Sequence, residues 1–544
     1  MTLFVSETEP QKPGQPDVAV LEDHTPEQAR CTRATALFTA ILGGLFLILN
    51  YIPLCHTDLW GHLAYGRWIA KTHQVPTTEP LVPLCQGVPY VDTEWLSQYL
   101  GYKIFAGMNR NPAGLQFAYA LSITICNVLL VAALRRRTGT YLAPLVGLAV
   151  FLAVNREQLG IIRPQLAGLV CYCLLFCLIT ARQFHKAYWV LIPVLFALWA
   201  NLHGSFLMGI MLLGLFAIGR AIDLIRRVGS LSSLWRDGEF RRYFLLTQLS
   251  IVAALLNPYG ALLYVEIFRI ADNPNVLELK EWLPLTIQMK QGKAAALATL
   301  LLMALYRWSP RRITGPEALT LVVFGAATLA TSRIIVWWAP VVAYYIGLHV
   351  AAIRQRKHPP QSSPRTGLST VMVLGLLWIA FAYTPLGITL VKGPPEKAKL
   401  AEVLQRAVSR STPRSAANYL WNNPPQGLVF NILEMGDFLL YYGPPKISLF
   451  CASHVHLLPP EVWQDYNLIS EAGAGWENRL NRYGANTVVL DRAPQREAIT
   501  KALRDDSDWE LLLEDSDTVI FGRKQIPGAP AQGAAPAEKK AEAH

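Results

Sequence analysis

Long apolar stretches alternate with short polar connections over most of the chain. A hydrocarbon core about 30 Å thick is crossed by roughly 20 helical residues, so each stretch is expected to form a helix that spans or nearly spans a membrane. About eleven such spans are predicted. They lie at residues 34–54, 113–134, 139–154, 164–181, 187–200, 205–225, 243–256, 294–306, 316–330, 334–352 and 367–391.

Lys and Arg residues gather in every second connection between the predicted spans. Short loops rich in these residues stay in the cytoplasm. The alternation therefore predicts that segment 1–33 is cytoplasmic, and that the large loop 55–112 and everything after residue 392 are extracytoplasmic. The basic connections are found at residues 135–137, 182–186, 226–242, 311–312 and 354–357.

The segment 393–524 has the composition of a soluble domain, in which short strand-like runs alternate with helical ones. This pattern predicts a small α/β domain. The strand-like runs are 428–432, 447–450, 487–490, 509–513 and 518–521, and the helical runs are 396–410, 460–471, 476–483 and 495–504. The last segment, 525–544, consists mainly of Pro, Ala, Gly, Glu and Lys and is predicted to be disordered.

Composition agrees with a mainly α, polytopic transmembrane bundle that carries a small α/β extracytoplasmic domain. Of the 544 residues, 52% are hydrophobic and only 16% are charged. The net charge of +11 is spread over the loops rather than gathered in one basic domain, so we expect no nucleic-acid partner. The cysteines show no zinc or haem spacing. Cys55 and Cys85 share the first outer loop, where they form either a disulfide or two separate thiols.

The first outer loop begins with an acidic residue close to the end of the first span. In HTDLWGHLAYGRWIAK, the apolar residues Leu59, Leu63 and Ile69 can share one face of a helix lying along the membrane surface, with Arg67 able to reach a phosphate. Asp58 would then stand where a lipid headgroup is presented. Its alternative interpretation is a solvated loop carboxylate.

A second acidic pair follows in GVPYVDTEWLSQYL, immediately before another apolar helix. Asp92 is suited to capping that helix, because its carboxylate can accept the free backbone N–H groups of the first turn. Contact with substrate is the alternative. Glu94 is a candidate second carboxylate for acid, base or metal chemistry.

Four further outer connections carry candidate substrate-binding residues. An arginine close to lipid is usually retained with a partner, so a phosphate ligand and snorkelling to the interface are both open. A histidine in a tight turn can bind a ligand or hydrogen-bond the turn. The candidates are Arg156 and Arg163 in NREQLGIIRPQ, Asn201 and His203 in ANLHGS, Glu281 in KEWLP and Arg333 in TSRIIVWW.

The order and common sidedness of HTDLW, DTEWL, RPQ, ANLHGS, NPYG and KEWLP resemble the GT-C superfamily of integral membrane glycosyltransferases. That group includes protein O-mannosyltransferases, lipid A aminoarabinose transferases and RgtA/B/C/D-like proteins. Some bacterial members also carry a C-terminal domain with a string like MGDFLLYYGPP, found here at residues 435–445.

The resemblance implies an inner-membrane enzyme that moves a sugar from a polyprenyl-phosphate donor to an envelope glycan, lipid or protein on the extracytoplasmic face. On that basis Asp58 is the general base or an aid to metal binding, assisted by Asp92 or Glu94. Arg163, Arg333 and His203 would stabilise the departing lipid phosphate.

The family comparison leaves the cofactor open. Asp58 is followed by Leu59 rather than by the second acidic residue of several members, so a divalent metal is possible but unassigned. Two other functions fit the composition: a noncatalytic scaffold that presents the C-terminal domain, and a secondary transporter. Transport is disfavoured, because the chain shows no inverted repeat and little charge at mid-span depth.

Overall fold

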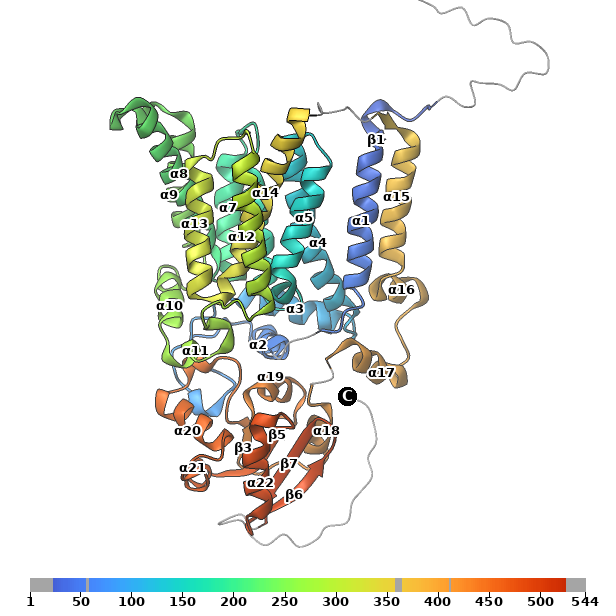
Figure 1. Cartoon of the computed structure of the whole chain (residues 1–544). Coiled ribbons are helices and arrows are strands. Elements are labelled where there is room, and N and C mark those ends of the chain that lie inside the picture. The colour runs from blue at the N-terminus through green and yellow to red at the C-terminus, as the bar shows by residue number, and fades with distance from the viewer. Residues whose placement is uncertain (1–22, 55–57, 358–363, 410–411, 525–544) are drawn as a thin grey trace, which may run out of the picture.

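A computed structural model describes residues 23–54, 58–357, 364–409 and 412–524. Every run predicted to cross a membrane contains a helix, and these helices stand side by side in one bundle (Figure 1). They are α1 (Arg33–Leu49), α4 (Ala113–Thr138), α5 (Leu142–Leu159), α6 (Gln165–Ile179), α7 (Tyr188–Leu202), α8 (Phe206–Val228), α9 (Gly238–Ala253), α12 (Lys290–Trp308), α13 (Gly315–Ala330), α14 (Ile335–Lys357) and α15 (Gly367–Ala382).

The helices differ in how well they match a membrane. Among the described residues, four have both the length and the apolar composition of a span, namely α4, α5, α8 and the segment Ser332–Arg356 that contains α14. Four others, α1, α6, α7 and α13, are shorter apolar helices. The protein is therefore an integral membrane protein, and its shorter helices depend on neighbours in the bundle.

The predicted last span, 367–391, is broken. α15 ends at Ala382, and α16 (Pro385–Lys392) continues at an angle of 83°. Pro385 cannot supply the N–H that would continue α15, and the Thr384 hydroxyl accepts the N–H of Gly387 to start the new helix. The run reads as continuous in sequence because both pieces are apolar.

α14 occupies the centre of the bundle and packs against α4, α5, α12 and α13. Two glycines allow its closest approach to α5. A Cβ on Gly147 would lie 3.2 Å from the Ala343 carbonyl oxygen, and one on Gly347 would lie 3.0 Å from that of Ala143. Small residues let helix backbones approach closely in a membrane, where dispersion rather than water drives packing.

The two ends of the bundle are chemically different. The connections after α4, α6, α8, α12 and α14 carry the basic clusters and lie at one end. At that end, the short strands β1 (Cys31–Thr32) and β2 (Arg365–Thr366) pair antiparallel and tie the start of α1 to the start of α15. The opposite end holds the C-terminal domain and the helices α2 (Asp58–Thr72), α3 (Trp95–Gly107), α10 (Leu262–Ala271) and α11 (Pro274–Leu277) (Figure 1).

The C-terminal domain is built on a five-stranded mixed sheet of order β4-β3-β5-β7-β6. β3 pairs in parallel with β4 and β5, whereas β7 is antiparallel to β5 and β6. All five predicted strand runs are confirmed. The strands are β3 (Leu428–Asn431), β4 (Ser448–Leu449), β5 (Ala485–Asp491), β6 (Trp509–Glu514) and β7 (Thr518–Arg523).

The predicted helices of this domain are also present, but two more were missed. α17 (Lys397–Ala407), α20 (Pro460–Ser470), α21 (Trp476–Arg482) and α22 (Glu497–Asp505) match the predicted runs. α18 (Arg414–Asn422) and α19 (Leu433–Tyr442) were not predicted as helices. The second omission matters, because α19 is the helix that packs against α2 at the end of the bundle.

Aromatic side chains hold α19 against α2. The ring of Trp60 lies 5.3 Å from that of Phe438 and 5.2 Å from that of Tyr442, both in edge-to-face contact. Trp60 is 1% exposed. Gly61 completes the contact, since a Cβ there would lie 2.6 Å from Oδ1 of Asp437. Glycine is required at this point because the Asp437 carboxyl occupies the space that a side chain would fill.

Candidate functional site

Asp58, the first residue of α2, contacts the C-terminal domain directly. Its Oδ1 accepts a hydrogen bond of 3.0 Å from the Ser453 hydroxyl. The same hydroxyl contacts Oδ2 of Asp437, and the Ser453 backbone N–H donates to Oδ1 of Asp437 over 3.1 Å. Asp437 is fully buried in α19. Two carboxyl groups from different parts of the chain thus meet at one serine.

A second group of side chains surrounds Glu94, at the start of α3. The Ser205 N–H donates to Nδ1 of His203 at 2.9 Å, so Nε2 of His203 carries the hydrogen that faces Oε1 of Glu94 at 3.0 Å. His62, one turn after Asp58 on α2, places Nδ1 at 3.5 Å from Oε2 of Glu94. Glu94 therefore connects α2 with the α7–α8 turn.

The surroundings of Glu94 keep it ionised. Burial opposes ionisation, but His203 and His62 together lower the pKa of Glu94 below its ordinary value. Burial is also the main effect on His62 and lowers its pKa, despite the nearby carboxylates of Glu94 and Asp58. The group thus contains an ionised acceptor held between two imidazoles.

Arg163 and Arg333 form the third group, and Glu281 joins them. Oε2 of Glu281 lies 2.8 Å from Arg163 and Oε1 lies 2.8 Å from Arg333. Arg333 also lies over the ring of Trp282, 5.5 Å from its centroid. The two arginines lower the pKa of Glu281 although burial alone would raise it. One carboxylate therefore fixes two guanidinium groups on the α5–α6 and α13–α14 connections.

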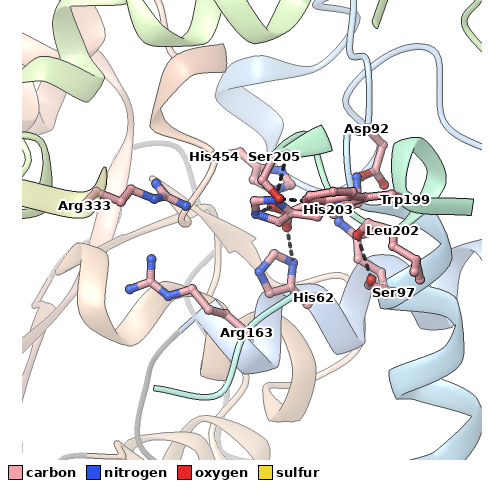
Figure 2. Close-up of polar contacts among 12 residues, drawn as sticks. His62, Asp92, Ser97, Arg163, Trp199, Leu202, His203, Ser205, Arg333 and His454 are labelled. Atoms are coloured by element: carbon pink, nitrogen blue, oxygen red, sulfur yellow. Dashed lines mark hydrogen bonds and ion pairs between the residues drawn. The ribbon is translucent and has the colours of Figure 1, made fainter. Parts of the chain in front are cut away.

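The three groups lie together at the end of the bundle that bears the C-terminal domain. Figure 2 shows the guanidinium groups of Arg163 and Arg333 next to one another, beside His62 and His203. Arg163 and Asp58 are close enough to influence each other electrostatically, as are Arg333 and Glu94. Segments from α2 to α14 thus bring acidic and basic side chains into one area.

Asp92 and Asn201 have mainly structural contacts. Oδ1 of Asp92 accepts the Glu94 N–H and the Gln98 side chain, each at 3.0 Å, and burial raises the pKa of Asp92 to about 8. Asn201 accepts from the Trp95 indole at 3.0 Å and donates to two main-chain carbonyls. Both residues brace the connections that carry Glu94 and His203.

Among the described residues, neither Arg156 nor Arg67 has a hydrogen bond or ion pair with this cluster. Arg156 is exposed on the last turn of α5. Arg67 stacks on Tyr441 and donates to the carbonyls of Leu440 and Tyr441 at the end of α19. Arg67 thus holds the C-terminal domain, and its expected contact with a phosphate stays a prediction.

The described residues do not assemble a divalent-metal centre. No three His, Cys, Asp or Glu side chains in the described ranges are placed to share a metal ion. Both oxygens of Glu281 face arginines, and both oxygens of Glu94 face histidines. We therefore derive no step through a metal. Cys55 lies outside the described residues, and its possible partner Cys85 is a buried free thiol.

Sequence reasoning missed four residues of this area: His62, Asp437, Ser453 and His454. His62 had a usable signal, because it follows Asp58 by four positions and therefore lies on the same helix face. Asp437 lies between Met435–Gly436 and the apolar run FLLYY in LEMGDFLLYY, which favours a buried carboxyl. No local pattern indicates Ser453 or His454, whose ring lies 4.5 Å from that of Tyr65 in α2.

Together, the helix bundle, the interfacial helices α2 and α3 and the C-terminal mixed sheet define a GT-C-like fold. Comparison with solved structures supports this assignment. ArnT from Cupriavidus metallidurans bound to undecaprenyl phosphate aligns over 91% of this chain and 99% of its own, with a TM-score of 0.52 and 13% identity. Its apo form aligns over 89% and 97%, with a TM-score of 0.51 and 13% identity.

The Archaeoglobus fulgidus oligosaccharyltransferase, tethered to an acceptor peptide, is similar over 84% of this chain and 68% of its own. Its TM-score is 0.51 and its identity 13%. No protein-family profile and no curated protein sequence matches the chain. At such low identity the likeness establishes the fold, and the chemistry has to be argued from the side chains.

Proposed function

We propose that the protein is a membrane glycosyltransferase that uses a polyprenyl-phosphate-linked sugar as donor and acts on the extracytoplasmic face. The observation that carries this proposal is the meeting of Asp58 with the Arg163–Glu281–Arg333 group at one end of the bundle. A carboxylate can take a proton from an acceptor hydroxyl, and paired guanidinium groups suit a phosphate. The undecaprenyl phosphate bound to ArnT has the same chemistry as the proposed leaving group.

In the proposed reaction, the O–H bond of the acceptor breaks and its proton passes to Asp58. The acceptor oxygen forms a bond to the anomeric carbon, while the bond from that carbon to the phosphate oxygen breaks. The electron pair leaves with the lipid phosphate, whose growing charge Arg163 and Arg333 stabilise. Glu281 keeps both guanidinium groups in place before the lipid arrives, which reduces the entropy lost on binding.

Glu94 and His203 serve this site by position and charge. Glu94 is an ionised acceptor for sugar hydroxyls, and its contact with His62 holds the helix that carries Asp58. The basic loops at the opposite end of the bundle support a cytoplasmic location for that end, with segment 1–33 beside it and segment 393–524 outside.

Binding of undecaprenyl phosphate tests the role of the arginines. The full chain in nanodiscs should bind this lipid, and should bind undecaprenol, which lacks the phosphate, more weakly. Arg333→Ala should weaken binding about 10-fold or more, the usual effect of losing a charge-assisted contact. Arg156→Ala is the matched control, since Arg156 lies outside the cluster. Equal affinities for the two variants would overturn the phosphate-binding assignment.

Donor consumption tests the role of Asp58. The protein is incubated with undecaprenyl-phosphate-linked hexoses and pentoses and an envelope fraction as acceptor, and release of undecaprenyl phosphate is measured by mass spectrometry. Asp58→Asn should lose on the order of 100-fold or more of the rate, because positioned general bases typically contribute that much. Asp505→Asn, at an exposed carboxyl of α22, is the control. A rate for Asp58→Asn equal to that of wild type contradicts the proposal. A noncatalytic scaffold would be indifferent to this substitution.

A further inference from the structure

The contact between Asp58, Ser453 and Asp437 joins the membrane bundle to the C-terminal domain at the proposed reaction centre. Ser453 and Asp58 are 395 positions apart in the chain. The Ser453 hydroxyl faces a carboxyl oxygen on each side, and its backbone N–H fixes it to Asp437. Gly61 leaves the space that the Asp437 carboxyl occupies. The arrangement therefore rests on three hydrogen bonds and a close backbone approach.

The number of hydrogens on Ser453 limits how it can bond to the two carboxyl groups. A serine hydroxyl has one hydrogen and can donate to only one carboxylate. For Ser453 to bond to both carboxyl groups, one of these must be protonated and donate to the serine oxygen. Asp437 is fully buried, whereas Asp58 is partly exposed, so burial places the proton on Asp437. The hydrogen bonds then run from Asp437 to Ser453, and from Ser453 to an ionised Asp58.

We propose that the C-terminal domain completes the proton-accepting group of the site, with Asp437 and Ser453 as positioning residues that orient the Asp58 carboxylate and hold one proton beside it. This inference rests on the proposed function and assigns to the C-terminal domain a part in the chemistry. In the resting state the two carboxyl groups share one proton. During transfer the acceptor proton becomes the second, and it resides on Asp58 until solvent removes it.

The charges near Asp437 agree with this arrangement. Burial, followed by the negative charge of Asp58, raises the pKa of Asp437 to about 7. Among the described residues, Tyr65 of α2 and Cys451 of the loop after β4 are also within electrostatic reach of Asp437, and burial raises the pKa of both, so they stay neutral. Arg67 contacts the main-chain carbonyls at the end of α19 instead of the carboxyl. Of these groups, Asp58 is thus the one whose charge affects the pKa of Asp437.

Asp437→Asn and Ser453→Ala separate the two positioning roles. Asparagine keeps a neutral donor toward Ser453 but cannot ionise. Wild-type activity should fall as the pH rises through about 7, because ionised Asp437 can no longer donate to Ser453, and this fall should be absent in Asp437→Asn. Ser453→Ala removes the bond that favours ionised Asp58, so the acidic limb of its pH profile should move upward by about one pH unit.

Infrared difference spectroscopy on the full chain in nanodiscs gives a measure independent of activity. At about pH 6, the C=O absorption of protonated carboxyls should be weaker by one group in Asp437→Asn than in wild type and in the Asp505→Asn control, because protonated Asp92 contributes to all three. Undiminished C=O absorption in Asp437→Asn overturns the inference. So do pH profiles of Asp437→Asn and Ser453→Ala that superimpose on the control.

The two proposals fail in different ways. If wild type keeps the carboxyl band but consumes no donor, the proposed function is overturned while the shared proton stands. If donor consumption depends on Asp58, but neither the carboxyl band nor the pH profile changes in Asp437→Asn, only the inference about the C-terminal domain is overturned.

Discussion

Replacing Gly61 by alanine adds a single methyl group at the contact between α2 and α19. Its Cβ would lie 2.6 Å from Oδ1, 2.7 Å from Cγ and 2.9 Å from Oδ2 of Asp437. These separations are shorter than real Cβ contacts allow, so the carboxyl must retreat by several tenths of an ångström. A retreat that moves the carboxyl away from Ser453 would lengthen the bond of 3.1 Å from the Ser453 N–H to Asp437.

The expected energies follow from two opposing effects. Alanine favours a helix interior over glycine by roughly 1 kcal/mol, whereas overpacking costs about 1–3 kcal/mol. Gly61→Ala should therefore lose at most about 2 kcal/mol of stability and remain folded. The effect of this substitution on the ionisation of Asp58 should be more pronounced than its effect on stability. A hydrogen bond to a charged group contributes about 1.5–3 kcal/mol, so partial loss of the Ser453 bond disfavours the ionised form of Asp58.

Melting temperature and the pH profile of donor consumption measure these effects. Gly107→Ala is the matched control, because Gly107 also lies in a helix at this end of the bundle and its added Cβ would meet no atom within 4 Å. Gly61→Ala should melt a few degrees lower than this control and lose activity first at acidic pH. If the two variants agree in both measurements, the proposed link from Gly61 through Asp437 to Asp58 is wrong.

Three further perturbations have defined outcomes. Trp60→Ala should lower stability by about 3–5 kcal/mol, detectable as a lower melting temperature, because it empties the aromatic contact between α2 and α19. Glu281→Ala should cost up to about 3 kcal/mol, since its carboxylate is shared by two guanidinium groups but is 28% exposed. Folded Asp437 keeps its proton to about pH 7, whereas the unfolded group loses it near 3.8, so this residue stabilises the folded state less as pH rises between those values. The melting temperature of Asp437→Asn relative to wild type should therefore increase between about pH 4 and about pH 7, and a constant difference would contradict the raised pKa.

The bundle was predictable because its determinants are local. Apolar runs fix where helices form, and basic connections such as 135–137 separate one end of the bundle from the other. The alternation of short strands and helices likewise predicted the sheet of the C-terminal domain. The break at Pro385 was missed because hydropathy does not report a change of helix direction.

The candidate site was predictable only in part. Arg163 and Arg333 were named because an arginine close to lipid is usually retained with a partner, and Glu94 and His203 because they are polar residues of outer connections. The structure brings these four residues together. The contacts of the two arginines with Glu281, and of Glu94 with His62, depend on how separate connections pack against one another. The sequence of any one segment does not reveal this packing. Arg156 satisfied the same sequence criterion as Arg163, yet it is exposed on α5 and, among the described residues, has no hydrogen bond or ion pair with the cluster.

The pairing of β1 with β2 has a consequence for the biosynthesis of the protein. Cys31 donates its backbone N–H to the hydroxyl of Thr370, 339 positions later, and α1 packs against α15 along the same edge. At a synthesis rate of about 5–20 residues per second, α15 leaves the ribosome roughly 20 to 70 seconds after α1. During that interval α1 has α4 as its main neighbour among the helices already made. The first helix therefore reaches its final position late, when the last helix of the bundle enters the membrane and closes it.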